Sequence, residues 1–344
     1  MLLETLGGYT IIDLLARGGM AEVYLATTSG EASVRRLVAI KRVLRQFNQS
    51  NDFIKMFHDE AKVAIQLRHK NVVTVHDFGL DRGHPFLVME YVPGQSLQVL
   101  KNKLMDKKIR LPLEHALYVV KEIASGLAYV HTLKDLESQA PLNLIHRDIT
   151  PQNILFGSHG DVKIIDFGVA KTDINTSTTQ VGMIKGKYGY LSPEQLELTS
   201  VDFRSDLFSL GVLFIELLRN KKLFNFNSEI EYFAQLRSYR CTPELVFSES
   251  WPSQVSEILL RLLQPDRERR YSSTHQVLED LTVTLNSLYP RYTEMDFVRY
   301  LQDWMPINQV SFNQIPRQYK TGEKVSRVIV KKNFNFVLPK GLVS

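Results

Sequence analysis

One stretch of the sequence constrains the fold and the chemistry more than any other. It reads His-Arg-Asp-Ile-Thr-Pro-Gln-Asn over residues 146–153, and the tripeptide Asp-Phe-Gly follows at 166–168. Apolar runs at 144–145 and 162–165 lie beside these polar residues. Such runs predict short buried strands, which would bring the polar residues together at one edge of a sheet.

Two carboxylates and one amide in these loops have the chemistry of a magnesium site. They belong to Asp148, Asn153 and Asp166. Carboxylate and amide oxygens suit Mg²⁺, a hard cation that keeps several waters and shares the phosphate oxygens of a nucleotide. The stretch therefore has side chains that suit a magnesium ion.

Length and composition are those of an ordinary soluble globular protein. The 344 residues are 44% hydrophobic and 23% charged, which allows two or more domains or lobes. The longest apolar run, 211–218 interrupted by Glu216, is too short to cross a bilayer, and residues 1–4 do not resemble the start of a signal peptide. The single Cys241 excludes an intrachain disulfide framework and a cysteine-based zinc site. We expect a cytoplasmic protein without a membrane span.

The positive net charge is confined to the C-terminal tail. The whole chain carries +5, whereas residues 306–344 contain seven basic residues and one acid, a charge of +6, so the other 305 residues carry about −1. The body therefore has no signature of nucleic-acid binding. The tail would suit docking onto the body or an acidic partner, and a solvated tail explains it equally well.

The first 92 residues predict a small β-rich lobe. Five β-type runs occur at 8–12, 23–26, 37–41, 72–75 and 85–89. A helical apolar stripe occupies 53–67, with Glu60 off the stripe. The turn at 16–21, Ala-Arg-Gly-Gly-Met-Ala, would let backbone N–H groups approach phosphates closely, although a plain β-turn explains it as well.

From Pro112 onward the sequence becomes helical. Residues 113–131 carry a 3.6-residue apolar period, and the polar link 132–143 predicts a surface loop. Residues 292–304 predict one more helix. Phe297, Leu301 and Trp304 would lie on one face of it and dock onto the body.

The stretches at 146–153 and 166–168 resemble the catalytic loop and the magnesium loop of eukaryotic-like protein kinases. The resemblance extends from about residue 9 to about 288. The turn 16–21 is similar to the kinase G-x-G-x-x-G-x-V loop, 37–41 to the V-A-I-K strand, and 192–194 to the A-P-E closure. Pro-Gln-Asn in the loop and Tyr-Leu-Ser-Pro-Glu at 190–194 look most like bacterial, Hanks-type Ser/Thr kinases.

This resemblance implies the α+β, bilobal protein kinase fold. Residues 1–92 would form the small lobe with the hinge, residues 93–290 the larger and mainly helical lobe, and residues 291–344 a C-terminal extension of one helix and the basic tail. ATP, Mg²⁺ and a protein substrate would be its partners. A transient homodimer would allow autophosphorylation in trans.

The resemblance also implies the catalytic and metal-binding roles. Asp148 would orient and deprotonate the substrate hydroxyl, while Asn153 and Asp166 hold Mg²⁺. Lys41, clamped by Glu60, would position the α- and β-phosphates.

A second set of residues would bind ATP. The backbone of Glu90 and Val92 would bond the adenine beside the gatekeeper Met89, and Val23, Ala39 and Leu155 would enclose the base. The complete set of nucleotide-binding residues is Ala16, Gly18, Gly19, Ala21, Val23, Ala39, Lys41, Met89, Glu90, Val92 and Leu155.

Two residue types are exchanged relative to the kinase pattern. Thr150 stands where Ser/Thr kinases usually have a lysine, and Lys187 stands after Gly186, where they usually have a threonine. If both loops follow the family's path, Lys187 would fill the space of the missing lysine and bond to Thr150. The alternative is that Lys187 points to solvent.

Other residues would have scaffolding or regulatory roles. Asp206 would accept backbone N–H groups of the catalytic loop, and Arg270 would pair with Glu194 in the interior. Arg147, which we expect to be buried, would receive a phosphate placed on the Thr/Ser cluster 176–179 by autophosphorylation.

Two rival functions stay open. Ala16, Ala21 and Thr150 would suit a pseudokinase that binds nucleotide as a scaffold, whereas the presence of Lys41 and Asp148 argues for catalysis. A small-molecule phosphotransferase of related fold is the other alternative. The long segment from 166 to 194 argues against it, because it resembles a peptide-docking platform.

Overall fold

The computed structural model describes residues 5–19, 21–28, 36–44, 57–58, 61–135, 138–167, 188–197, 200–247 and 250–305. The chain divides into two compact units. The small unit contains residues up to Leu67 and Val73–Gln95, and the large unit contains Arg68–Val72 and Ser96–Met305. No helix within the described ranges is long and apolar enough to cross a membrane.

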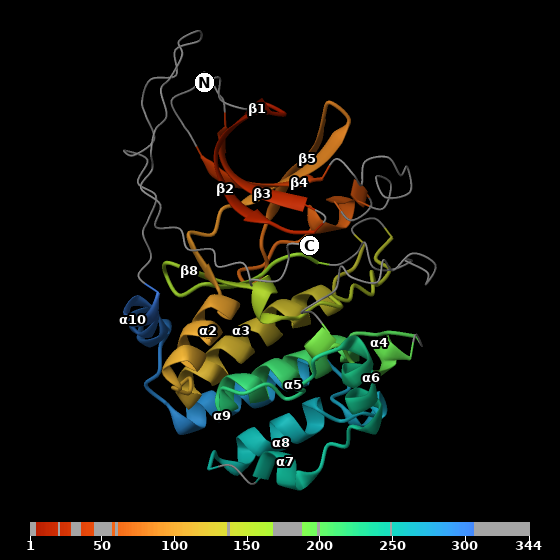
Figure 1. Cartoon of the computed structure of the whole chain (residues 1–344), viewed down its shortest axis with the longest axis vertical. Coiled ribbons are helices and arrows are strands. Elements are labelled where there is room, and N and C mark those ends of the chain that lie inside the picture. The colour runs from red at the N-terminus through yellow and green to blue at the C-terminus, as the bar shows by residue number, and fades with distance from the viewer. Residues whose placement is uncertain are drawn as a thin grey trace. The chain divides into compact units, whose positions relative to one another are not determined.

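The small unit is built on a six-stranded antiparallel sheet in the order β1-β2-β3-β4-β6-β5 (Figure 1). Its strands are β1 (Thr5–Leu6), β2 (Tyr9–Arg17), β3 (Ala21–Thr28), β4 (Leu37–Val43), β5 (Val75–Asp81) and β6 (His84–Glu90).

The two faces of this sheet carry different cores. One face packs Ala26, Ile40 and Val88 together with Leu6 and Phe86. On the other face lie Val43, Leu87 and Val75, which pack against a helical segment that includes residues 57–58 and 61–64. Because side chains alternate along a strand, β4 and β6 contribute to both cores.

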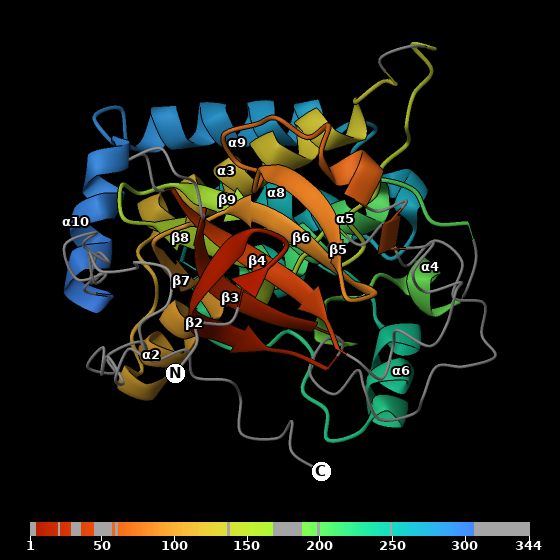
Figure 2. The same cartoon turned by 90° about the horizontal axis from the view of Figure 1, so that it is seen from above.

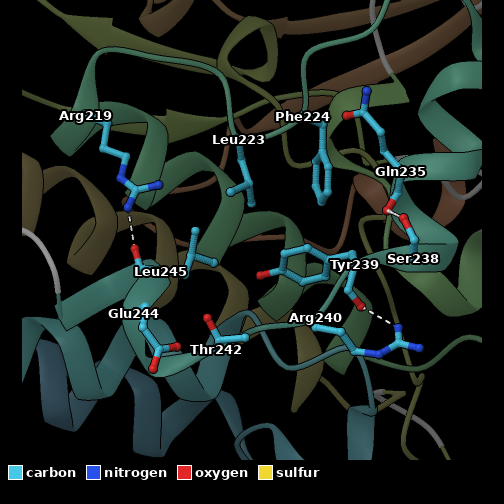
Figure 3. A pocket seen from close by; sticks show the side chains of 10 residues that line it. All are labelled: Arg219, Leu223, Phe224, Gln235, Ser238, Tyr239, Arg240, Thr242, Glu244 and Leu245. Carbon is cyan, nitrogen blue, oxygen red and sulfur yellow. Dashed lines mark hydrogen bonds between the residues drawn. The ribbon is translucent and has the colours of Figure 1, made fainter.

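The large unit is helical. Figure 2 shows α9 alongside α3, and these two helices pack against each other. Its helices are α2 (Leu97–Lys107), α3 (Leu113–His131), α4 (Pro193–Leu196), α5 (Arg204–Arg219), α6 (Glu229–Ser238), α7 (Pro243–Phe247), α8 (Ser253–Leu262), α9 (Thr274–Leu288) and α10 (Glu294–Trp304).

Helix α5 forms the centre of this unit. Every residue from Ser205 to Leu218 is buried, including Asp206 and Glu216. Gly211 allows close contact with α8, since a Cβ there would lie 2.8 Å from the Cβ of Leu262. A helix buried on all sides must pair its charged side chains internally, and those pairs organise the site described below.

Short strands flank the loops that contain Asp148 and Asp166. Strand β7 (Gly94–Ser96) spans the boundary between the two units, while β8 (Ile154–Gly157) and β9 (Val162–Ile164) form a hairpin with Phe156 opposite Val162. Residues 146–153 precede β8 directly, and Asp166 follows β9. The predicted strand at 162–165 is therefore confirmed, whereas 144–145 is not a strand.

Three expectations about elements need correction. The apolar run 72–75 is not a strand, because β5 begins only at Val75 and Val72 makes an isolated bridge to Ile164. Helical structure in the larger part begins at Leu97 in α2 rather than at Pro112. Strand β1 was not predicted, since two residues carry no periodic pattern.

Candidate active site

Asp206 fixes the backbone of the loop at 146–153. It is fully buried in the first turn of α5, where its Oδ2 accepts the N–H of His146 at 2.7 Å and its Oδ1 accepts that of Arg147 at 2.7 Å. His131, at the end of α3, lies with Nε2 2.9 Å from Oδ2 and Nδ1 2.7 Å from Thr274 Oγ1. Burial alone would raise the pKa of Asp206, but His131 and the backbone donors hold it below its ordinary value. The predicted role of Asp206 is confirmed.

His146 connects this loop to the strand that precedes Asp166. Its Nδ1 accepts the N–H of Asp148 at 3.2 Å, so the ring proton lies on Nε2, 3.0 Å from the carbonyl oxygen of Ile165. The ring also packs edge-on against Phe167, with centroids 4.7 Å apart. The imidazole is completely buried, so it holds the two loops together rather than facing solvent.

Asn153 holds the residue that was predicted to be the base. Its Nδ2 donates to the backbone oxygen of Asp148 at 2.8 Å, and its own carbonyl accepts the N–H of Ile165 at 2.9 Å. Asp148 and Asn153 are 8% and 5% exposed. The structure thus connects Asp148, Asn153 and the residue before Asp166 through one network.

Two residues of the site have left-handed backbone conformations. Arg147 has a φ of 64° and Asp166 a φ of 58°. Residues other than glycine adopt such angles rarely, and they occur mostly where the surrounding structure requires them. Arg147 directly precedes the predicted base Asp148, and Asp166 is itself a predicted metal ligand. Arg147 is half-buried, so the expectation of full burial was wrong.

Buried acceptors next to Asp148 lack donors among the described residues. The Thr150 hydroxyl and the Gln152 side-chain oxygen are inaccessible to solvent and have no hydrogen-bond partner there. The backbone of Thr150 is nevertheless ordered, because its carbonyl accepts the N–H of Asn153 at 3.0 Å. Buried polar atoms are normally paired, so the Gln152 oxygen needs a donor from elsewhere and the Thr150 hydroxyl needs a donor or an acceptor.

The oxygen donors of the loops fit a hard divalent cation. The Asn153 amide nitrogen is engaged with Asp148, which leaves the amide oxygen as the group for a cation, and Asp166 is an exposed carboxylate. Among the described residues, no three His, Cys, Asp or Glu side chains form a metal-binding group. A cation here would therefore need water and phosphate as further ligands.

In the small unit, the predicted nucleotide-binding residues lie in rows on one face of the sheet. Ala16 pairs with Val23, which pairs with Lys41, and Ala39 pairs with Met89 in the adjacent row. This is also the face against which the helical segment packs.

The ends of these strands carry the remaining predicted groups of the small unit. The Gly18 N–H donates to the Ala21 carbonyl at 2.8 Å and closes the turn that contains Gly19, and the Glu90 N–H donates to Thr74 at 2.9 Å. Val92, in the connection after β6, is half-buried.

Three further predictions concern residues outside these rows. Leu155 lies in β8 of the large unit and is half-buried. Glu60 and Lys187 lie outside the described residues, as do the Thr/Ser cluster 176–179 and the tail 306–344.

Comparison with known proteins identifies this arrangement. A family model described as "Protein kinase domain" matches residues 9–281. The chain belongs to the protein kinase family. The kinase fold is shared with the kinase domain of Mycobacterium tuberculosis PknI, at 24% identity and a TM-score of 0.60 over 81% of this chain and 97% of that one.

Bacterial kinases are among its relatives. The kinase is 34% identical over 285 residues to "Tyrosine-protein kinase MasK" of Myxococcus xanthus, with 83% of this chain and 44% of MasK covered. It is 30% identical over 281 residues to "Serine/threonine-protein kinase PrkC" of Bacillus subtilis, with 82% and 41% covered. The kinase thus spans less than half the length of these relatives. The resemblance to bacterial Ser/Thr kinases is confirmed.

The closing segment of the kinase is anchored to the large lobe by a buried ion pair. Arg270 donates to both carboxylate oxygens of Glu194, at 2.6 and 2.9 Å, and Ser205 Oγ donates to the same carboxylate at 2.6 Å. These donors keep the pKa of Glu194 below its ordinary value although burial opposes them. The predicted pair is confirmed. Gln195, next in the chain, donates to the Arg147 carbonyl at 3.2 Å and so joins this segment to the catalytic loop.

A second buried cluster anchors the start of this segment and was not predicted. Lys101 of α2 lies 2.5 Å from Glu216 of α5 and 2.9 Å from the Tyr190 hydroxyl, which itself donates to Glu216 at 2.7 Å. Burial and the charge of Glu216 raise the pKa of Tyr190. The sequence offers one signal for it, because a glutamate that interrupts an apolar helical run needs a buried partner.

Proposed function

We propose that this kinase transfers the γ-phosphate of ATP to Ser or Thr hydroxyls of protein substrates, with Mg²⁺ as the metal. The observation that carries the proposal is the position of Asp148, a nearly buried carboxylate. Its backbone is held on one side by His146 and on the other by Asn153, while Asp206 fixes the two preceding residues. A general base works only when it is held in reach of the proton that it accepts.

In the proposed reaction, Asp148 orients the substrate hydroxyl and accepts its proton as the oxygen attacks the γ-phosphorus. The bond from the γ-phosphorus to the β–γ bridging oxygen breaks, and ADP leaves. Lys41 contacts the α- and β-phosphates, and Glu60 clamps Lys41. Asn153 and Asp166 would hold Mg²⁺, which supplies positive charge against the phosphate oxygens. Because phosphoryl transfer has a loose transition state, positioning and electrostatics provide most of the rate enhancement.

ATP would bind to the face of the small lobe that carries Lys41. Val23 and Ala39 lie on this face as apolar contacts for the base, and Met89 lies in the row of Ala39. The Glu90 N–H is already bonded to Thr74, so Glu90 would use its carbonyl for adenine and Val92 its N–H. Gly18 and Gly19, between Ala16 and Ala21, would let the backbone approach the phosphates.

Two buried polar atoms beside Asp148 have no hydrogen-bond partner among the described residues. They support the hypothesis that Lys187 replaces the lysine that Ser/Thr kinases usually have at the position of Thr150. The Gln152 oxygen needs a donor, and the Thr150 hydroxyl can accept a hydrogen bond from one. A lysine ammonium has three donors and no acceptor. We therefore propose Lys187 as the cation that stands beside Asp148 in place of the usual lysine and bonds to Thr150.

The names of the relatives favour catalysis over a scaffold. PrkC is named a serine/threonine kinase, whereas MasK is named a tyrosine kinase. Ser/Thr transfer is the activity that we assign, and tyrosine transfer is the second candidate, favoured by the 34% identity to MasK. The pseudokinase alternative is not favoured, because the base and both proposed metal ligands are present.

Phosphosite mapping tests the proposal. Purified protein incubated with Mg²⁺ and labelled ATP should incorporate phosphate, with sites in the cluster 176–179 on Thr and Ser and with transfer in trans through a transient homodimer. Phosphotyrosine alone would replace the assigned specificity by that of the second candidate. No incorporation into the protein or into a panel of peptides would instead support the pseudokinase alternative.

A further inference from the structure

A carboxylate at the start of β3 is buried although it lies next to the turn of the small lobe. The side chain of Glu22 is 9% exposed. Its Oε1 lies 2.7 Å from Arg17 Nη2, and its Oε2 lies 3.2 Å from Arg42 Nη2 and accepts the Tyr24 hydroxyl at 2.5 Å. Arg42 also donates to the Tyr24 oxygen at 2.6 Å and lies over its ring at 4.8 Å. We call Arg17, Glu22, Tyr24 and Arg42 the strand latch.

The strand latch lies on the face of the sheet opposite Lys41. Glu22 pairs across the sheet with both Arg17 and Arg42, whereas the neighbouring Val23 pairs with Lys41. Successive side chains on a strand point to opposite faces. The side chains of the latch therefore lie on the opposite face from Val23 and Lys41.

The latch joins three strands at the point where the proposed phosphate-binding turn begins. Arg17 ends β2 and directly precedes Gly18, Glu22 is the second residue of β3, and Arg42 in β4 directly follows Lys41. Among the described residues of the turn, the Gly18 N–H donates to the Ala21 carbonyl. Because Gly18 and Gly19 allow the backbone of this turn many alternative conformations, contacts at the two ends of the turn must limit them.

The latch is an interaction of charged groups. Burial alone would raise the pKa of Glu22, but the hydrogen bonds from Tyr24 and Arg42 and the charge of Arg17 hold it below the ordinary value. Glu22 is therefore ionised at neutral pH. Since a nearly buried carboxylate strongly needs its partners, the two ends of the turn cannot separate without breaking these contacts.

We propose that Glu22 is a positioning residue that holds the turn 17–21 in the conformation that binds the phosphates of ATP. This rests on the proposed function, in which the turn contacts ATP. Loss of the Glu22 charge lets the turn leave that conformation, so ATP binds to a smaller fraction of the molecules. An apparent dissociation constant rises in inverse proportion to the competent fraction, while the groups that transfer the phosphate stay unchanged.

Glu22→Gln tests this, with Asp13→Asn as the matched control. Asp13 is an exposed acid on β2 of the same hairpin, away from the turn. In Glu22→Gln without nucleotide we expect faster amide hydrogen exchange at residues 17–21. We also expect an ATP KM about tenfold higher, as for a competent fraction of about one tenth, and a kcat within about twofold. Asp13→Asn should match the wild type in all three quantities.

Arg17→Gln is a second variant. It removes only the ion pair between Arg17 and Glu22, and the Arg17 side chain is 65% exposed. This variant should raise the ATP KM by a smaller factor, and the Glu22→Gln/Arg17→Gln double variant should be no worse than Glu22→Gln alone, because coupled residues are not additive. Unchanged exchange and unchanged KM in Glu22→Gln, or additive effects in the double variant, would overturn the latch. A wild type that transfers no phosphate would overturn the proposed function, and the exchange comparison would still decide on the latch.

Discussion

At the scale of single residues, the catalytic loop is held by groups that lie far from it in the sequence. Asp206 fixes two backbone N–H groups of the loop from a distance of about sixty residues. His131 supports Asp206 from a third segment. The backbone of Asp148 is held at both ends, by His146 and by Asn153. The rigidity that a general base needs therefore comes from the buried polar network around it.

Lys187 is the residue on which the proposed exchange depends. Lys187→Met should lower kcat by about 10²–10³, the cost of removing one well-placed donor at developing charge, and should change the ATP KM much less. Lys221→Met, at an exposed lysine after α5, is the matched control and should behave as the wild type. A Lys187→Met variant that turns over normally would show that Thr150 does not have this lysine as its donor.

Arg270 should be essential for stability rather than for chemistry. Its side chain is fully buried and donates to Glu194 and to the carbonyls of Arg204, Gln264 and Pro265. Arg270→Ala leaves a buried charge unpaired, so we expect the free energy of unfolding to fall by about 3–5 kcal/mol in urea titrations. Arg269→Ala, at the exposed neighbour, should change it by no more than about 0.5 kcal/mol. Equal effects of the two variants would contradict this assignment.

At the scale of elements, the sequence predicted best where one pattern dominates. Helix α3 has the predicted bounds, because its apolar residues recur with helical spacing over 113–131. The run 72–75 failed because Val72 is buried through a bridge to Ile164 and not in a sheet. Strand β5 lies at the sheet edge, and its apolar residues Val75, Phe78 and Leu80 do not alternate strictly, so its period is weak.

In the candidate site too, some contacts could be predicted from the sequence and others could not. The Glu194–Arg270 pair followed from the family resemblance, and the structure confirms it. The contacts of Lys101 with Glu216 and of Glu22 with Arg42 bridge separate elements. One sequence does not specify which distant charges meet, since many pairings satisfy the same composition.

Helix α10 should contribute to the stability of the large lobe, whereas the tail should not. Phe297 and Leu301 are almost completely buried, and the Phe297 ring packs against Tyr118 and Phe156 at 5.2 Å. Each such side chain contributes about 1.5–3 kcal/mol when fully buried. Truncation after Tyr289 should therefore lower the free energy of unfolding by at least about 3 kcal/mol, and truncation after Met305 should leave it nearly unchanged. Equal stability of both truncated forms and the full chain would refute this.

At the scale of the whole molecule, stability should fall on acidification in two steps. Burial lowers the pKa of His115 below its ordinary 6.5, so the folded state keeps it neutral while the unfolded state gains a proton as pH falls below 6.5. The pKa of Glu194 lies below its ordinary 4.5, so its contribution is lost as pH falls through and below 4.5. Both groups bind more protons when unfolded, which makes stability rise with pH. Urea midpoints measured between pH 7.5 and 4 should therefore decrease with falling pH, and a constant or rising midpoint would contradict the burial of these groups.

In the whole molecule, phosphate transfer should depend on Asp148, and one kinetic comparison tests this most directly. Phosphate transfer from ATP should be measured for the wild type, for Asp148→Asn and for Glu257→Gln, an acid-to-amide change at an exposed position of α8. We predict that Asp148→Asn lowers kcat by about 10²–10⁴, the usual contribution of a general base, with an ATP KM within a few-fold, while Glu257→Gln matches the wild type. Transfer by Asp148→Asn at the wild-type rate would contradict the account.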